Sequence, residues 1–345
     1  MTTKDNRTKK RGGGLRVLVL IAVILVLAAA VYIVSQRLLA DNGGRAGSGS
    51  LFFGGASTPT EEELEAQGWI SPGALKAYAE EYNVNTEFLS RIFRDKIVYK
   101  RGGSILYEDI DPNLKKHPYD WDRLRWDERR PHYEYESKTE GGAFEAVLGI
   151  DVSRYQGDID WKKVAADGVS FAMIRMGYRG YDTGRLVTDE FFEANMRGAA
   201  DAGVKVGAYV FSQATNKAEA IEEAELVLTS VAPYKVTFPI VFDIEEISGQ
   251  NARTDALTPA EITDIAIAFC ERVAKDGYKP MIYANPKWFV SRMELDRLEP
   301  YDKWLAQYYK KPAFPYAFSM WQFTNTGAVD GINGDVDLDL AFIPK

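Results

Sequence analysis

From residue 147 onward, the chain alternates short apolar runs with longer amphipathic stretches. The apolar runs have the length of buried strands, and the stretches between the early ones have the spacing of helices. Such alternation produces parallel strands that are covered by helices. The pattern predicts an α/β fold, a modified (β/α) barrel of about eight strands, with a doubly wound open sheet as the alternative. The eight strand candidates are VLGIDVS (147–153), SFAMIRMGY (170–178), VKVGAYVFS (204–212), FPIVFDIE (238–245), KPMIYAN (279–285), KWLAQY (303–308), SMWQFT (319–324) and VDLDLAF (336–342).

Local signals support the helices between the early strands. Gly203 and Gly277 follow two of the amphipathic stretches and suit helix C-termini. Thr258 precedes Glu261 by three residues, which is typical of a capped helix start. The connections between residues 308 and 335 are too short or too rich in Pro and Gly for full helices. No Gly-rich phosphate loop follows the first strand, which argues against a nucleotide-binding open sheet.

The front of the chain contains an unbroken apolar run, VLVLIAVILVLAAAVYIV, at residues 17–34. As a helix it is about 27 Å long, close to the thickness of the hydrocarbon core of a bilayer. The basic residues before it favour a cytoplasmic N-terminus. We expect residues 1–16 to form a basic cytoplasmic tail and residues 17–34 a single transmembrane helix, with the body outside a bacterial cell. A cleaved signal peptide, and therefore a secreted protein, is the alternative.

Two segments separate this apolar run from the predicted barrel. Residues 41–60 are rich in Gly and Ser and read as a flexible linker. Residues 61–146 are expected to be a small accessory region, helical at first, including NTEFLSRIF (85–93), and then irregular and aromatic. Within it, Trp121 and Trp126 are as consistent with packing on the barrel as with binding a ligand.

Composition narrows the function classes. The net charge is −8, but residues 1–37 carry +6, which leaves −14 on the rest and argues against nucleic acid as a partner. Cys270 is the only cysteine, so a disulfide framework is excluded, and we expect it to be buried. Both histidines, His117 and His132, precede residue 140. The barrel must therefore work without histidine, and we predict no metal or other cofactor.

Polar residues fall at the predicted strand ends, where barrel enzymes carry their function. Each has a simpler explanation as a cap or a solvated strand end, but together they place carboxylates and aromatic rings on one face. Asp243 and Glu245 are two residues apart and should point to the same side of a strand. Carboxylates that raise each other's pKa, beside flat aromatic surfaces, suit glycoside hydrolysis. The candidate residues are Asp151, Tyr178, Tyr209, Asp243, Glu245, Tyr283, Trp321, Gln322 and Asp337.

Eight short sequence motifs, taken in their order along the chain, give a more specific prediction than the pattern of strand-end residues. Together they resemble glycoside hydrolase family 25, the Chalaropsis-type lysozymes or N-acetylmuramidases, over residues 147–345. Two departures are modest: GAYVFS lacks a histidine that many members carry after Tyr209, and Asp339 stands where Asn is common. The motifs are GIDVSRYQGDIDW, FAMIRMGYRG, VGAYVFSQA, PIVFDIEE, MIYAN, WLAQY, MWQFT and GDVDLDLAF.

The resemblance implies cleavage of the β-1,4 bond between N-acetylmuramic acid and N-acetylglucosamine in peptidoglycan. It implies that Glu245 is the general acid, with Asp243 beside it. Asp151 and Asp337 complete the acidic cluster. It also implies saccharide-binding residues at the strand ends, namely Tyr178, Tyr209, Tyr283, Trp321 and Gln322.

The mechanism and two rival functions stay open at this point. Alternate residues on one side of a strand are ~6.5–7 Å apart, more than the roughly 5–5.5 Å of a retaining acid–nucleophile pair. We therefore hypothesise that Asp243 orients or stabilises the 2-acetamido group of the sugar, which attacks instead. The rival functions are a non-catalytic wall-binding module and a hydrolase of another N-acetylated glycan. Glu246 should point away from the site and have a structural role, for example in an ion pair.

Overall fold

A computed structural model of the chain describes residues 71, 73, 75, 76, 85–128, 132–136, 144–247, 249 and 251–345. The chain separates into two compact units, Met1–Val84 and Asn85–Lys345. In the described part of the chain, no helix combines the length and the apolar character that crossing a membrane requires. Outside the described residues lie the predicted cytoplasmic tail (1–16), transmembrane helix (17–34), linker (41–60) and nearly all of 61–84.

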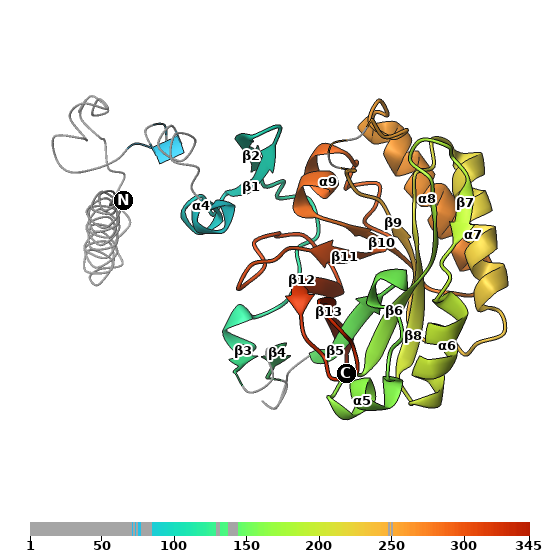
Figure 1. The fold of residues 1–345 in the computed structure, drawn as a ribbon. Helices are drawn as coiled ribbons and strands as arrows, with labels where there is room; N and C mark the ends of the chain where they lie inside the picture. Colours follow the sequence, from blue (N-terminus) through green and yellow to red (C-terminus); the bar gives the residue numbers. More distant parts are fainter. Residues whose placement is uncertain are drawn as a thin grey trace, which may run out of the picture. The chain divides into compact units, whose positions relative to one another are not determined.

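Eight strands close into a barrel in the second unit (Figure 1). All neighbours are parallel except β13, which runs antiparallel between β12 and β5. The pairing of β5 with β6 closes the ring and rules out the open-sheet alternative, while the short β7 (Leu186–Thr188) extends β6 on one side. All eight predicted strands are confirmed, and they are β5 (Phe144–Val152), β6 (Phe171–Arg179), β8 (Lys205–Phe211), β9 (Ile240–Asp243), β10 (Pro280–Ala284), β11 (Asp302–Ala306), β12 (Met320–Gly327) and β13 (Val336–Pro344).

Helices cover only part of this ring, the strands β5 to β10, which we call the helix-covered half. Thr258 and Glu261 form the predicted capping box at the start of α8, and Cys270 is fully buried within that helix. Gly203 and Gly277 adopt φ of 79° and 84° just after α6 and α8, where a side chain would be strained. The helices are α5 (Trp161–Ala166), α6 (Phe192–Asp201), α7 (Lys217–Val231), α8 (Pro259–Lys275) and α9 (Pro286–Ser291).

The strands β11 to β13 form the helix-free half, because the described residues 308–335 contain no helix, as predicted. Part of its outer face is covered by a segment whose described residues are 85–128 and 132–136, which we call the accessory segment. The predicted helix at residues 85–93 is present as α4, but two antiparallel hairpins were not anticipated. The elements of this segment are α4 (Thr86–Ile92), β1 (Lys96–Arg101), β2 (Ser104–Asp109), a short 3₁₀ turn (Trp121–Arg123), β3 (Leu124–Asp127) and β4 (His132–Tyr135).

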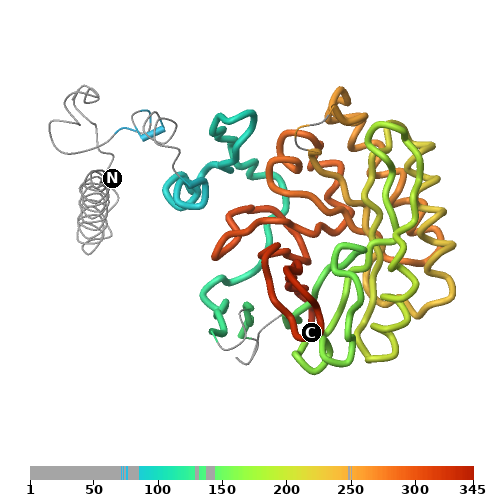
Figure 2. Tube along the Cα trace, in the orientation of Figure 1, coloured from blue at the N-terminus to red at the C-terminus, as the bar shows by residue number. Residues whose placement is uncertain are grey.

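Aromatic rings join the accessory segment to the helix-free half. Tyr133 of β4 stacks on Trp321 of β12 with 5.4 Å between ring centroids, and Tyr119 stacks on Phe342 of β13 at 4.0 Å. Trp121 contacts Phe342 and Trp321 edge-on. Trp121 thus packs on the barrel, and the rings exclude water from a face that α-helices cover elsewhere. In Figure 2 the blue-green trace of this segment passes beside the red strands.

The barrel interior is filled at its base and open at the other end. Side chains alternate between the two faces of each strand, so every second side chain points into the barrel. Phe171, Met173, Val241, Met281 and Met320 share an apolar cluster that fills this space. At the next inward positions along most of these strands, polar residues replace the apolar ones, which creates a site at the carboxyl ends of the parallel strands.

Candidate active site

A cavity of about 470 Å³ opens at this end of the barrel. Its size is that of a site for a small ligand or a few sugar units. It brings together all four predicted carboxylates and four of the five predicted saccharide-binding residues. The lining residues are Asp151, Ser153, Arg154, Tyr155, Gln156, Arg175, Tyr178, Tyr209, Phe211, Asp243, Glu245, Tyr283, Trp304, Tyr308, Gln322, Asn325 and Asp337.

Strand register explains how the carboxylates meet. Asp151 near the end of β5 lies directly opposite Asp337 near the start of antiparallel β13, so both reach the same rim. Asp243 is the last residue of β9, beside Tyr283 of β10. Glu245 lies two residues beyond the end of β9 rather than on the strand itself. It nevertheless lines the same cavity as Asp243, as expected.

These carboxyls have raised pKa values. Burial and then the charge of Asp337 raise the pKa of Glu245 to about 7, and burial raises the pKa of Asp337 to about 6. Burial, followed by the charges of neighbouring carboxylates, holds the pKa of Asp151 and of Asp243 well above the usual range. The four groups cannot all be ionised near pH 7, so at least one proton is retained among them.

Arg175 on β6 places a cation in the same cavity. Its guanidinium forms an ion pair with the buried Asp189, with 2.7 Å between the closest nitrogen and oxygen. The positive charge of Arg175 opposes the rise in the pKa of Asp243. Among the described residues, Asp243 Oδ1 is buried and has no hydrogen-bond partner. Of the four carboxylates, Asp243 is therefore the one with both an adjacent cation that opposes its raised pKa and a buried oxygen without a hydrogen-bond partner.

Gln322 connects four elements around the cavity. Its Nε2 donates to Asp151 Oδ2 at 2.7 Å. Its Oε1 accepts from the hydroxyls of Tyr283 at 2.9 Å and Tyr308 at 2.7 Å. The amide is thus fixed in one orientation, and it positions Asp151 and two tyrosine rings together. Asp339, two residues from Asp337, is fully buried beneath this layer and accepts from Trp304 Nε1 at 2.8 Å.

Tyrosines provide the flat surfaces that sugar faces contact. Tyr209 and Tyr283 are buried in the wall of the cavity, whereas Tyr178 is partly exposed within it. Tyr155 is 74% exposed at the rim, and the guanidinium of Arg175 lies 5.1 Å from its ring centroid. Acid groups, one ion-paired cation and aromatic walls without histidine form the type of site that glycosidases use.

Comparison with known proteins identifies the family. A family model for glycosyl hydrolases family 25 matches residues 150–332. The chain belongs to glycosyl hydrolases family 25. It is therefore a glycoside hydrolase, and the resemblance drawn from the motifs is confirmed.

Relatives of this family 25 enzyme align over little more than half of its chain. The uncharacterized protein YegX of Escherichia coli K12 is 29% identical over 197 residues, 56% of this chain and 69% of YegX. Lysozyme M1 of Streptomyces globisporus is 30% identical over 206 residues, 55% of this chain and 66% of that protein. Among solved structures, the autolysin LytC of Streptococcus pneumoniae has a TM-score of 0.51 at 20% identity, covering 71% of this chain and 56% of LytC. That structure supports the fold alone.

One predicted saccharide contact of the family 25 enzyme lies elsewhere. Trp321 does not line the cavity: its side chain is fully buried, and its Nε1 donates to the Gln307 carbonyl at 2.7 Å. The reason is the two-residue period of a strand. Met320 and Gln322 point into the barrel, so Trp321 between them points outward, against Tyr133 of the accessory segment.

The alternation of side chains between the two faces of a strand would also have identified several cavity residues that the sequence reasoning missed. Arg175 has the same parity as Met173 on β6, and Trp304 the same parity as Ala306 on β11. Others lie on loops and could not be placed by a strand pattern. The missed residues are Ser153, Arg154, Tyr155, Gln156, Arg175, Phe211, Trp304 and Asn325.

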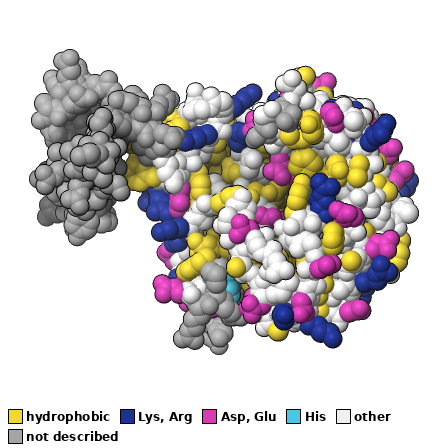
Figure 3. Space-filling model, in the orientation of Figure 1, with side chains coloured by type: hydrophobic (Ala, Val, Ile, Leu, Met, Phe, Trp, Pro, Cys, Tyr) yellow, Lys and Arg dark blue, Asp and Glu magenta, His cyan; other side chains and the backbone are white. Residues whose placement is uncertain are grey.

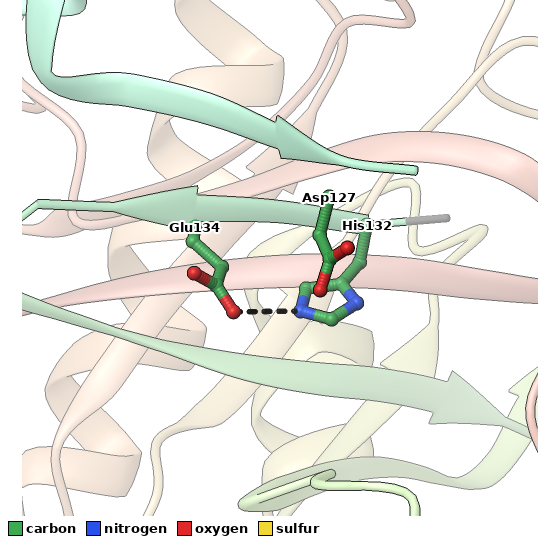
Figure 4. Close-up of side chains that lie close together, drawn as sticks. All are labelled: Asp127, His132 and Glu134. Atoms are coloured by element: carbon green, nitrogen blue, oxygen red, sulfur yellow. Dashed lines mark ion pairs between the residues drawn. The ribbon is translucent and has the colours of Figure 1, made fainter. Parts of the chain in front are cut away.

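Outside the cavity, one cluster has the residue types of a metal site (Figure 4). Asp127 on β3 is the cross-strand partner of His132 on β4, and Glu134 follows two residues later on the same side. One ligand atom of each lies within 4.8 Å of the others. The side chain of Glu134 is 56% exposed and lies 3.7 Å from His132 Nε2. This geometry is also that of an ordinary contact between a buried histidine and an exposed carboxylate.

Proposed function

We propose that this family 25 enzyme is a peptidoglycan muramidase. It cleaves the β-1,4 bond between N-acetylmuramic acid and N-acetylglucosamine in the bacterial cell wall. The observation that carries the proposal is the convergence of Asp151, Asp243, Glu245 and Asp337 in one aromatic-lined cavity. Two relatives support the substrate class by their names, Lysozyme M1 and, at 29% identity over 150 residues, the N,O-diacetylmuramidase of Arthroderma benhamiae.

In the mechanism that we propose, Glu245 is the general acid. A carboxyl with a pKa of about 7 keeps a large protonated fraction at neutral pH and can pass its proton to the glycosidic oxygen. As the bond to the leaving sugar breaks, the 2-acetamido oxygen attacks the anomeric carbon. In this mechanism the retained proton of the cluster is on Glu245 and Asp243 is ionised beside the Arg175 guanidinium, so Asp243 accepts a hydrogen bond from the acetamido N–H and balances the developing positive charge. Glu245, by then a carboxylate, takes a proton from the water that opens the cyclic intermediate, and the released end retains its anomeric configuration.

Two other routes make different products or intermediates. If Asp243 were the nucleophile, a covalent ester would accumulate on its carboxyl with a slow or fluorinated substrate. If water attacked directly, an NMR time course would show the inverted anomer first. Initial release of the retained anomer, with no ester on Asp243 by mass spectrometry, is the result expected here.

The decisive experiment identifies the bond that is cut. The full chain is incubated with insoluble peptidoglycan, and the released fragments are reduced with borohydride and analysed by mass spectrometry. Muramitol ends are expected from the wild type and not from Glu245→Gln. The matched control is Glu246→Gln, one residue away and exposed, which should release the same fragments. Binding without release would indicate a wall-binding module, and release from chitin alone would indicate another glycan.

We further propose that residues 17–34 anchor the enzyme in the cytoplasmic membrane with the barrel outside the cell. The apolar length of this run and the basic residues before it support the proposal. Such an enzyme would act on the cell's own wall. Fractionation of cells that express the chain should place it in the membrane with an intact N-terminus. Recovery from the medium as a protein lacking residues 1–30 would indicate a cleaved signal peptide instead.

A further inference from the structure

Tyr308 belongs to the part of the cavity wall that lacks regular structure. It lines the cavity, its residue is 49% exposed, and it follows β11 in residues 307–319, which we call the wall loop. Its hydroxyl donates to Gln322. Within the loop, Gln307 Oε1 accepts the backbone N–H groups of Ala313 at 2.7 Å and Phe314 at 3.3 Å.

The accessory segment binds the wall loop next to Tyr308. The hydroxyl of Tyr309 donates to Thr86 Oγ1 at 2.7 Å, and the backbone N–H of Lys310 donates to Glu87 Oε1 at 3.2 Å. These bonds connect residues 223 positions apart in the sequence. Adjacent tyrosines therefore have divided roles, because Tyr308 faces the cavity and Tyr309 is held by the start of α4.

The same segment also binds the far end of the wall loop. The backbone N–H of Ala317 donates to the Lys115 carbonyl at 2.9 Å, and that of His117 donates to the Pro315 carbonyl at 3.2 Å. The Tyr316 hydroxyl accepts from the backbone N–H of Asp111 at 2.8 Å. The loop is thus fixed at both ends by a part of the chain that lies before the family match.

We propose that the accessory segment is a positioning part of the active site, which holds the wall loop so that Tyr308 completes the substrate cavity. Thr86 and Tyr309 are the positioning residues nearest to Tyr308. A loop fixed before the substrate arrives loses less conformational freedom on binding, so the contact strengthens substrate affinity rather than proton transfer. The expected effect on KM rests on the proposed muramidase function, whereas the fixed conformation of the wall loop does not.

The test is Tyr309→Phe in the full chain, with soluble uncrosslinked peptidoglycan strands as substrate. Loss of one neutral hydrogen bond should raise KM about three- to tenfold. The kcat should stay within about twofold and its pH profile should not move, because no carboxyl of the cavity is touched. The matched control is Tyr135→Phe, which removes a tyrosine hydroxyl that accepts from the backbone N–H of Asp120, a bond that lies entirely within the accessory segment. It should leave KM unchanged.

Two further measurements separate positioning from general destabilisation. In a Tyr308→Ala background, the added Tyr309→Phe change should have no further effect on KM, because the side chain that it positions is gone. Amide hydrogen exchange over residues 307–319 should be faster in Tyr309→Phe and unchanged in Tyr135→Phe. Equal KM in wild type and Tyr309→Phe, or additive effects with Tyr308→Ala, would overturn the proposal. If the wild type cut no peptidoglycan, the muramidase assignment would fail, and unchanged exchange would independently refute the positioning role.

Discussion

The two halves of the barrel reach the same cavity by different structural means. The helix-covered half carries Asp243 and Glu245 on β9 and the residues after it, with Arg175 on β6. The helix-free half carries Asp337, Gln322 and the wall loop with Tyr308. The proposed proton donor and its carboxylate partner therefore lie at the end of β9 and just beyond it, in the half of the barrel that helices cover.

The helix-free half depends instead on a segment outside the family. Trp321 and Phe342 on its outer face pack on Tyr133 and Tyr119 of the accessory segment. The family match ends at residue 332, before β13, although β13 closes the barrel and brings Asp337 to the cavity. Most of the proposed chemistry thus lies on elements inside the family match, and the opposite wall is supported by contacts from residues that precede the match.

Exposed ion pairs occur in both halves, and Lys311 of the wall loop pairs with Asp122 of the accessory segment at 3.1 Å. Ion pairs link neighbouring elements of the helix-covered half, such as Arg272 of α8 with Glu225 of α7 at 3.4 Å. In the space-filling view, acidic and basic side chains alternate along that edge of the molecule (Figure 3). Exposed pairs of this kind contribute little to stability. The apolar contacts beneath α7 and α8 therefore hold this half together, as the aromatic contacts hold the other.

The largest expected effect is a loss of activity caused by a substitution in the helix-covered half. Glu245→Gln keeps the shape of the side chain but cannot donate a proton to the glycosidic oxygen. We expect kcat to fall by about 10²- to 10⁴-fold, the usual contribution of a general acid. Steady-state cleavage of soluble peptidoglycan strands measures it, with circular dichroism to verify folding. A folded variant that keeps more than a tenth of the wild-type kcat would exclude Glu245 as the acid.

The second effect concerns stability and compares one aromatic side chain in each half. Phe269→Ala removes a fully buried ring from α8 and should lower the free energy of unfolding by about 3–5 kcal/mol. Trp121→Ala removes a partly buried ring between the accessory segment and the barrel, and should lower it by about 2–3 kcal/mol. Urea unfolding measures both. A loss below about 1 kcal/mol for Trp121→Ala would mean that the accessory segment is not an integral cover.

The third effect is a dependence of stability on pH. The pKa of Glu245 rises from 4.5 to about 7 on folding, so the native state binds this proton more tightly than the unfolded chain does. The resulting stabilisation is present below about pH 4.5 and is lost as the pH rises through 7. The free energy of unfolding of Glu245→Gln minus that of wild type should therefore be larger at pH 8 than at pH 4, by on the order of 1–3 kcal/mol. Thermal unfolding at the two pH values tests the sign, and equal differences at both would contradict the raised pKa.

Much of this architecture can be predicted from local sequence pattern. Strands of a closed barrel are short, apolar and separated by amphipathic stretches, so the eight strands could be recognised individually. Because function collects at strand ends, Asp151, Asp243, Glu245 and Asp337 could be proposed together. Their meeting in one cavity follows from parallel order and from the register of β13 against β5.

The rest depends on contacts between residues far apart in the chain. Trp321 is a predicted saccharide contact, but the alternation of side chains along β12 directs its ring out of the barrel. There it packs on Tyr133 of the accessory segment. The hairpin β1–β2 does carry a local signal that the sequence analysis missed, namely Gly102 and Gly103 at φ of 57° and 87° between two apolar runs, whereas the polar strands β3 and β4 offer no such signal. The bond from Tyr309 to Thr86 spans 223 positions, and no local pattern encodes such a pairing.

The smallest expected effect is that of substituting Glu246, the residue next to Glu245. Glu246 is exposed and forms an ion pair with Lys287 of α9, which agrees with the expectation that it points away from the site. Glu246→Gln removes a surface pair and should change the free energy of unfolding by less than about 1 kcal/mol. Its kcat and KM should stay within about twofold of wild type. If Glu246→Gln instead lost activity to the extent expected of Glu245→Gln, the acid would have to be assigned to Glu246, and the cavity geometry would no longer explain the chemistry.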